Sequence, residues 1–514
     1  MSYKYNIKKN AIKGSTTGVL FLFIKTLLGF ISKIVFVRTL GIEYNGLNSL
    51  FVSIIQVLNL ADLGIGSVLV YSLYKPIADG DEEQICALLQ LYKVYYRIIG
   101  SIILIIGLSI IPVINVFISQ DIPDDINIYL VYLMNLSATV LSYWLFAYKN
   151  SLFDAHQQVH ISNMLSIVTT IIKGIIQLIV LIIYKNYYFY LMIEILAQVS
   201  FNILIALSAQ YKYPNYAPKG KLEKKEIDTI NQKVKYIFWT RLCGVITNHA
   251  DSIVISAFLG LSILGKYNNY YYILSTIMLM FDKCFQSIRA GVGNLLITQD
   301  NSNNALVLYR LTYAVSFLSA IVCSCLLNVY QPFISLAFGR ENVLDFGIVC
   351  LICVYFLSYI YPILWAVFKD AAGLWKEDRL RSIAGPISNL AINLLLVQLI
   401  GLYGIIISTI ISYMFISGPW LLYNVRKHAI VFSIKEYISK ILEHWFLIAI
   451  SSITSMLLCS IVSSKISSLF MIIVLNLMIS ILISMLIFLS ACKKSSEQHY
   501  YIQMIKSYAG RVIK

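Results

Sequence analysis

Long apolar runs separated by short polar segments recur along the whole chain. A helix needs about 20 mostly apolar residues to cross the hydrocarbon core of a bilayer, and fourteen segments meet this requirement. The pattern therefore predicts an all-α polytopic membrane protein with about fourteen transmembrane helices. The predicted spans cover residues 14–37, 46–70, 94–119, 127–148, 161–184, 187–209, 236–260, 267–291, 306–334, 347–369, 383–401, 402–424, 444–463 and 467–491.

Composition and charge agree with this pattern. Hydrophobic residues make up 59% of the chain and charged residues 13%, which excludes a soluble enzyme built around one core. If both termini lie inside, 31 of the 40 Lys and Arg residues fall in inside segments and 5 in outside loops. This is the asymmetry of the positive-inside rule. The net charge of +15 therefore orients the chain in the membrane, and no nucleic-acid partner is expected.

A short glycine motif occurs twice, at the same predicted outside turn of each half. Gly41 and Gly46 join the first two spans, and Gly260 and Gly265 lie 219 residues further on, between the seventh and eighth. The repeat predicts two six-helix lobes related by pseudo-two-fold symmetry, with two helices appended. The expected domains are an N-terminal lobe, a basic cytoplasmic linker, a C-terminal lobe, two appended helices and a cytoplasmic tail, at 1–213, 214–235, 236–424, 425–491 and 492–514.

Several predicted spans carry ionisable and polar residues at helical spacing. Because a charge in the hydrocarbon layer costs at least about 2.5–3.5 kcal/mol, such residues are expected to face the protein interior, where they can line a cavity for a polar cargo. The cations are Lys25, Lys33, Lys173 and Arg241, the carboxylates are Asp62, Glu194 and Asp251, and the further polar lining is Gln56, Asn59, Gln198 and Asn248.

Two interpretations of these charges remain open. Each cation can pair with a carboxylate and hold helices together. Alternatively, the cations bind a phosphate-bearing substrate, since ammonium and guanidinium groups bind phosphate oxygens well, while the carboxylates carry coupling protons. Asp62 and Asp251 are the preferred candidates for that second role.

Catalytic and metal chemistry finds little support. Cys350 and Cys353 have the spacing of a metal pair, but they fall inside a predicted span without a second pair, so packing is the better explanation. There is no Gly-rich nucleotide loop followed by Lys-Ser/Thr, so the chain is not expected to use ATP. We expect no enzyme, catalytic residue, metal or cofactor. Most of the 37 tyrosines are typical of interface belts, whereas Tyr355, Tyr359 and Tyr361 fall deeper, where aromatic rings can also stack on sugars.

The motifs resemble a known family. The relevant segments are residues 37–47, 61–66 and 74–76 in the first half, and residues 256–260 and 265–267 in the second. They are similar to bacterial polysaccharide flippases of the Wzx type, which are grouped with MATE-type antiporters and lipid II flippases.

This resemblance implies a specific transport activity. The substrate would be an undecaprenyl-pyrophosphate-linked oligosaccharide repeat unit, exported across the cytoplasmic membrane for capsule, O-antigen or a related polymer. Both termini would be cytoplasmic. The implied partners are the lipid-linked oligosaccharide, membrane lipids, and the polymerase and glycosyltransferases of the same pathway.

Three alternatives to a flippase agree less well with the sequence. A MATE-like ion-coupled exporter of small molecules is expected to have a carboxylate-rich lobe, and the basic residues of the first span argue against this alternative. A membrane polysaccharide polymerase or glycosyltransferase usually needs a large external loop, whereas the predicted outside loops are short. A non-transporting scaffold would not need charges inside its spans.

Overall fold

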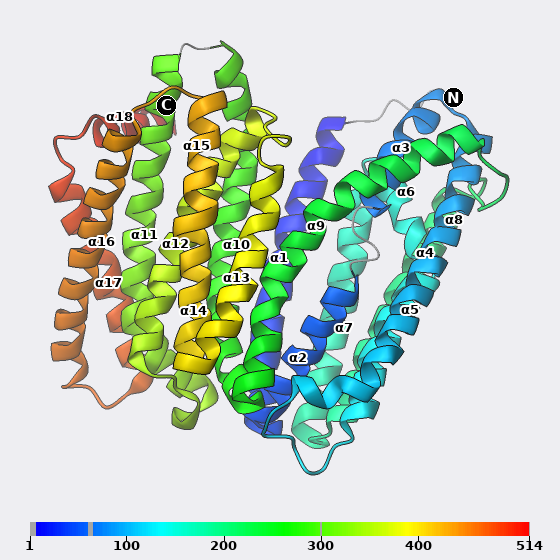
Figure 1. Ribbon diagram of the computed structural model, residues 1–514, viewed down its shortest axis with the longest axis horizontal. Coiled ribbons are helices and arrows are strands. Elements are labelled where there is room, and N and C mark those ends of the chain that lie inside the picture. The colour runs from blue at the N-terminus through cyan, green and yellow to red at the C-terminus, as the bar shows by residue number, and fades with distance from the viewer. Residues whose placement is uncertain (1–6, 60–64, 299–300, 513–514) are drawn as a thin grey trace. The chain divides into compact units, whose positions relative to one another are not determined.

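The computed structural model describes residues 7–59, 65–298 and 301–512, and the regular secondary structure of these residues is helical (Figure 1). The chain divides into two compact units, Met1–Gly265 and Lys266–Lys514. Each unit is a bundle of long helices that carry apolar side chains on their outer faces, as expected of helices in lipid. The expectation of an all-α membrane protein is confirmed.

Unit 1 is built on a few extensive helix pairs. α1 packs along α7, α7 packs on α8, α8 and α4 both pack on α5, and α2 packs on α9. Its helices are α1 (Ile7–Leu40), α2 (Ile42–Leu58), α3 (Ile65–Asp79), α4 (Glu82–Ile110), η2 (Ile111–Phe117), α5 (Ile128–Trp144), η3 (Ala147–Lys149), α6 (Asn150–Ala155), α7 (Val159–Ile183), α8 (Tyr187–Lys212) and α9 (Lys224–Leu259), and α10 (Leu261–Thr298) begins in this unit.

Unit 2 has two groups of helices. α11, α16 and α17 pack on one another, while α12 packs on α11, α14 and α15. The helices are α11 (Asn301–Phe338), η4 (Arg340–Asn342), α12 (Phe346–Ala371), α13 (Arg379–Ile400), α14 (Leu402–Ile411), the π-helix η5 (Ser412–Ser417), α15 (Gly418–His428), α16 (Ile434–Ser463), α17 (Leu469–Ala491) and α18 (Ser496–Val512).

Ten described helices are long and apolar enough to cross a membrane, or eleven if the bent pair Ile128–Trp144 and Ala147–Ala155 is one span. The three remaining predicted spans, 46–70, 236–260 and 267–291, correspond to α2 with α3, to α9 and to α10. α2 and α3, with 17 and 15 residues, are each shorter than a full crossing, while α9 and α10 carry many polar side chains. The count of fourteen therefore stays a prediction, as does the division into five domains.

Predicted inside segments meet one another in unit 1. The ring of His156, from the segment 149–160, stacks on Tyr213 of the segment 210–236 at 4.3 Å between centroids. Gln84, from the segment 71–97, donates to Glu226 across 2.9 Å. Segments far apart in sequence thus gather at one end of the bundle, as expected when successive spans alternate in direction and both termini lie on the same side.

The ends of the spans that adjoin predicted outside loops gather in the same way. The Tyr187 hydroxyl donates to Asn48 at 3.1 Å, and the backbone N–H of Asn127 donates to the Tyr188 hydroxyl at 2.7 Å. Alternation of the connecting segments between two ends is therefore a property of the fold. The sign of the loop charges, through the positive-inside rule, predicts which end is cytoplasmic.

A buried ladder of Ser and Asn side chains joins α11, α16 and α17. The Asn328 amide on α11 donates to Ser455 on α16 and to Ser480 on α17, both at 3.0 Å. Asn476 on α17 donates back to the Asn328 carbonyl at 3.0 Å. In lipid, where apolar burial does not hold helices together, small polar side chains that pair across an interface favour one specific packing. The two appended helices are thus bonded firmly to α11.

The C-terminal helix α18 is held to the same group by an ion pair. Lys440 of α16 lies 2.5 Å from Glu497 of α18. Burial alone would raise the pKa of the Glu497 carboxyl, but the hydrogen bond and charge of Lys440 outweigh it and hold the pKa below its usual value. The Tyr501 hydroxyl also donates to the carbonyl of Arg310 at 3.2 Å, so the tail contacts α11 as well.

Candidate functional site

The best-defined charged contact among the predicted site residues joins α7 and α8. The Lys173 ammonium lies 3.0 and 3.1 Å from the two carboxylate oxygens of Glu194. Gln177, one turn further along α7 and only 2% exposed, donates to the same carboxylate at 3.1 Å. The Lys173 and Glu194 side chains remain 28% and 42% exposed. The carboxylate is therefore compensated by charge and hydrogen bonding while still being reachable from solvent.

This geometry fits the pairing interpretation for these two residues. A substrate phosphate would have to compete with Glu194 for Lys173, and a coupling proton would have to break the pair. The roles of Lys173 in phosphate binding and of Glu194 in ion coupling therefore remain proposals, and each requires the ion pair to open during transport.

A double-mutant cycle measures this pair. We expect Lys173→Met and Glu194→Gln each to lower the stability of the purified protein, and the double variant to lose less than the sum of the two. The coupling should be about 1 kcal/mol, because a half-exposed pair lies between surface pairs of about 0.2–1 kcal/mol and the larger cost of leaving a buried charge alone. Denaturant unfolding in detergent is the measurement, and additive losses would show that the pair does not couple the helices.

The two lysines of α1 lie beside this cluster, because α1 packs along α7. Lys25 is exposed and its ammonium sits 5.9 Å from the centroid of the Phe21 ring. Among the described residues it forms no ion pair. Lys33 is half-buried two turns further on, next to the buried Ser32. The structure thus places both predicted cations on the helix adjoining the Lys173–Glu194 pair.

An aromatic contact fixes how the outer part of α1 meets α8. The Phe36 ring packs edge-on against Tyr187 and Tyr190, with centroids 5.6 and 5.0 Å apart. Tyr190 also lies near Ser32 and Glu194. Ser32 of α1 thus adjoins the polar groups of α7 and α8 through Tyr190 and Glu194. The spacing of polar residues predicted each stripe, but not which stripes adjoin.

The remaining predicted site residues are spread over α2, α8 and α9. Gln198 is half-buried one turn beyond Glu194, Asp251 is half-buried on α9, and Gln56 is exposed on α2. The Asn59 side-chain oxygen is buried without a hydrogen-bond partner in the part of the chain that the structure describes. Asp62 and the side chains of Arg241 and Asn248 lie outside the described residues.

The two copies of the glycine motif contact each other, which the sequence repeat did not predict. Gly41 and Gly260 both adopt positive φ, 116° and 91°, where they end one helix and start the next. Beyond them the starts of α2 and α10 cross so closely that the Asn45 side chain donates to the Gly265 carbonyl at 3.0 Å. Positive φ favours glycine because it has no Cβ, so both turns depend on this residue type.

The second glycine of each motif lies at the crossing itself. A methyl group at Gly46 would overlap the Leu261 carbonyl, lying 2.7 Å from its carbon atom, and one at Gly265 would lie 2.9 Å from the side chain of Ile42 and overlap its carbonyl. The two contacts are reciprocal, because Leu261 occupies in the second motif the place of Ile42 in the first. This reciprocity supports the interpretation of the motif as a structural repeat.

A model of the polysaccharide biosynthesis protein family matches residues 11–287, which include α1, α7, α8 and both glycine motifs. The chain belongs to this polysaccharide biosynthesis family. The match spans more than half of the chain and covers every residue of the candidate site. None of the curated proteins compared with the chain matches it.

Solved structures of two transporter types share the fold of this family member. The lipid II flippase MurJ in an inward closed conformation aligns over 93% of this chain and 98% of its own, with a TM-score of 0.64 and 14% identity. An inward-facing multidrug resistance MATE family transporter of the MOP superfamily aligns over 78% and 94%, with a TM-score of 0.59 and 11% identity. The eukaryotic MATE transporter AtDTX14 aligns over 85% and 99%, with a TM-score of 0.52 and 11% identity.

At such low identities the likeness establishes the fold and nothing finer. Family and fold together confirm the resemblance to polysaccharide flippases of the MATE/polysaccharide-exporter superfamily. The chain is therefore a multi-pass membrane protein of the polysaccharide biosynthesis family, with the fold that these transporters share. Its substrate and the roles of its site residues are the subject of the proposal that follows.

Proposed function

We propose that the protein is a flippase that moves undecaprenyl-pyrophosphate-linked oligosaccharide repeat units across the bacterial cytoplasmic membrane, for capsule or O-antigen-type polysaccharide. It works by alternating access, with both termini in the cytoplasm. Membership of the polysaccharide biosynthesis family and the fold shared with a lipid II flippase support a lipid-linked cargo.

The observation that carries the proposal is the cationic side of α1. Lys25 lies exposed in the middle of an apolar helix, without an ion pair among the described residues. An ammonium in a membrane helix is costly unless water or a counter-charge reaches it. A pyrophosphate supplies that counter-charge and strong acceptor oxygens. We assign the same role, binding of the pyrophosphate as the headgroup moves, to Lys33 and Arg241.

The remaining groups have supporting roles in the proposed cycle. The pyrophosphate moves along Lys25, Lys33, Lys173 and Arg241 while the isoprenoid tail stays in the bilayer beside α1. Asp62, Glu194 and Asp251 are candidates for coupling to an ion gradient, and Gln56, Asn59, Gln198 and Asn248 supply hydrogen bonds to the polar cargo. Glycosyltransferases provide the lipid-linked unit on the inside, and a polymerase consumes it on the outside.

Deletion of the gene in its host tests the proposal. We expect lipid-linked repeat units to accumulate at the inner leaflet and surface polysaccharide to be lost, with both defects reversed by the full chain. The amounts of lipid-linked unit and of surface polymer are the measurements. Unchanged surface polymer in the deletion strain, together with a new sensitivity to toxic small molecules, would favour a MATE-like exporter instead.

A further inference from the structure

Unit 2 contains a cluster of tyrosines that no transport role described above uses. Tyr355 and Tyr359 lie one turn apart on α12, and both contact Tyr413. The rings of Tyr355 and Tyr413 stack at 6.3 Å with 22° between their planes, and Tyr359 meets Tyr413 edge-on at 5.7 Å. Tyr355 is buried, whereas Tyr359 and Tyr413 are half-buried, so part of the cluster is open to a ligand.

A carboxylate from a third helix completes the cluster. The Tyr359 hydroxyl donates to Asp282 of α10 across 3.0 Å. Among the described residues Asp282 forms no ion pair, and the neighbouring Lys283 ammonium instead donates to Gln286 at 3.3 Å. A half-buried carboxylate in a membrane protein without a cation should face water or a polar ligand. Asp282 therefore has acceptor capacity that the protein itself does not use.

The backbone that carries Tyr413 is itself unusual. Ser412–Ser417 form a π-helix between α14 and α15. Such turns are rare in proteins, and those that occur often lie at functional sites. The wide turn is fixed by the Ser412 hydroxyl, which donates to the Gly385 carbonyl at 2.9 Å. The following Gly418 packs so closely that a methyl group there would lie 2.6 Å from the Tyr413 carbonyl. The π-helix thus holds Tyr413 against α12 at a defined place.

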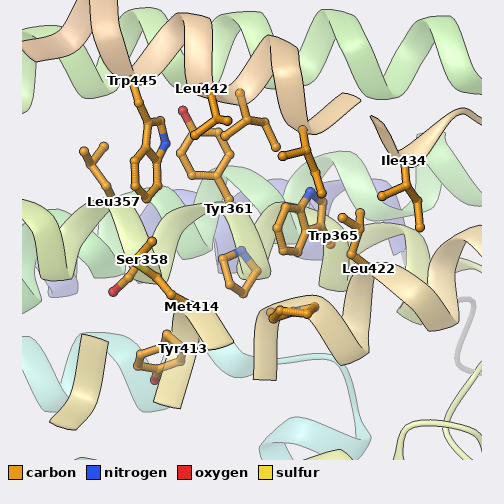
Figure 2. Close-up of a pocket in the computed structure, with 15 residues that line it drawn as sticks. Leu357, Ser358, Tyr361, Trp365, Tyr413, Met414, Leu422, Ile434, Leu442 and Trp445 are labelled. Carbon is orange, nitrogen blue, oxygen red and sulfur yellow. The ribbon is translucent and has the colours of Figure 1, made fainter. Parts of the chain in front are cut away.

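An apolar pocket of about 300 Å³ borders the cluster and shares Tyr413 with it. Figure 2 shows Trp365 and Trp445 on the far side of this pocket, with the Tyr413 hydroxyl turned away from them. The pocket wall itself is almost entirely apolar. Its few polar groups include the Tyr361 hydroxyl, which pairs with Ser316 at 2.9 Å, and the indole N–H of Trp445, which has no hydrogen-bond partner among the described residues. The polar side of the region is therefore the one that Asp282, Tyr359 and Tyr413 make.

The arrangement suits a polyhydroxylated ligand better than an organic cation. A cation site encloses the charge between ring faces, but here Tyr355 and Tyr413 stack on each other. What the cluster offers instead is tyrosine hydroxyls beside an acceptor carboxylate, and the Tyr359 hydroxyl, which donates to Asp282, can still accept a hydrogen bond. Sugar hydroxyls donate and accept hydrogen bonds, so they suit such a site, and the exposed parts of Tyr359 and Tyr413 add aromatic surface beside it.

We propose that Asp282, Tyr359 and Tyr413 form a binding site in unit 2 for the sugar portion of the transported lipid. This inference rests on the proposed function. It adds a site that binds the carbohydrate and that lies far in sequence from the phosphate-binding lysines. Its consequence is a division of labour, in which unit 1 binds the charge common to all such lipids and unit 2 recognises the sugar.

The test compares two lipid probes on the full-length protein in nanodiscs. One is undecaprenyl pyrophosphate without sugar, and the other is the glycosylated repeat-unit lipid extracted from host membranes. We expect the wild type to retain the glycosylated lipid preferentially when bound lipids are quantified by mass spectrometry. Asp282→Asn and Tyr413→Leu should each reduce this preference by about tenfold, and Tyr359→Phe by about threefold, since a hydrogen bond to a charged group exceeds a neutral one.

Two matched controls make the same chemical changes outside the cluster. Tyr361→Phe removes a hydroxyl two residues further along α12, on its Ser316 side, and Phe415→Leu replaces an aromatic ring in the same π-helix that is 69% exposed. Both should keep the preference of the wild type. Tyr359→Phe removes a single oxygen atom, so it keeps the test decisive if a larger change impairs folding.

The possible outcomes separate the two proposals. If the wild type retains the glycosylated lipid and the three cluster variants keep its preference, the sugar site is wrong and the flippase proposal stands. If the wild type retains neither probe, the proposed function fails as well. A third outcome would overturn the sugar site and identify an organic-cation site. In that case tetraphenylphosphonium would bind to the wild type but not to Asp282→Asn, and the glycosylated lipid would not compete with it.

Discussion

Export of surface polysaccharide should fall about tenfold when Lys25 is replaced by alanine, with the protein still inserted in the membrane at normal levels. A charge-assisted hydrogen bond is worth about 1.5–3 kcal/mol, and about 1.4 kcal/mol corresponds to a factor of ten. Because Lys25 has no carboxylate partner among the described residues, its removal leaves no orphaned charge behind. The measurement is surface polymer per cell, normalised to the amount of protein in the membrane.

Three further variants give this prediction its controls. Lys25→Arg should keep most of the export, because guanidinium also binds phosphate. Lys13→Ala removes an exposed cation from the start of the same helix, outside the predicted span, and should export normally. Arg241→Ala should resemble Lys25→Ala if the two share the headgroup. Normal export by both Lys25→Ala and Arg241→Ala would show that the phosphate-binding idea is wrong.

Replacing Gly46 or Gly265 with alanine should abolish most export and lower the stability of the purified protein. The added methyl group meets backbone atoms of the crossing chain, which cannot rotate out of the way as a flexible side chain would. Overpacking a well-packed contact costs about 1–3 kcal/mol, and a clash with backbone lies at the upper end. Thermal unfolding in detergent and the export assay are the two measurements.

Gly291→Ala is the matched control for the crossing. It makes the same change on α10, the helix that carries Gly265, at a position where a new methyl group meets no atom within 4 Å. Alanine also has the better helix propensity, so this variant should be at least as stable as the wild type. Equal stability of Gly46→Ala and Gly291→Ala would contradict the close contact between the starts of α2 and α10.

The sequence predicted the helices well because one physical requirement dominates them. Hydrocarbon demands about 20 apolar residues per crossing, and that pattern is local. The alternation of sides followed from loop charges, and the repeat followed from two glycine pairs. Each of these signals is readable over a short stretch, without knowing which helices are neighbours.

Partnership between distant residues was harder to predict. Glu194 was identified as a buried carboxylate, but four cations were available, and only packing of α8 on α7 selects Lys173. The glycine motifs were seen as a repeat, yet their mutual contact depends on a crossing that no spacing encodes. The π-helix at Ser412–Ser417 also escaped detection, because its sequence has the composition of an ordinary apolar span. Tyr359 was noticed for its depth, but Asp282 lies 77 residues earlier in the chain.

The Ser and Asn ladder of α11, α16 and α17 has a consequence for how the protein is made. Asn328 is synthesised and released into the bilayer long before Ser480, its partner 152 residues later. During that interval the Asn328 amide has its bond to the Ser324 carbonyl of its own helix, but the bonds that join α11 to α17 are missing, and a polar face in lipid without its partners is costly. The newly made chain therefore stays vulnerable to quality-control proteases until its last transmembrane helix is inserted. A ribosome that stops short of α17 leaves a product marked for removal, although both copies of the glycine motif are already present.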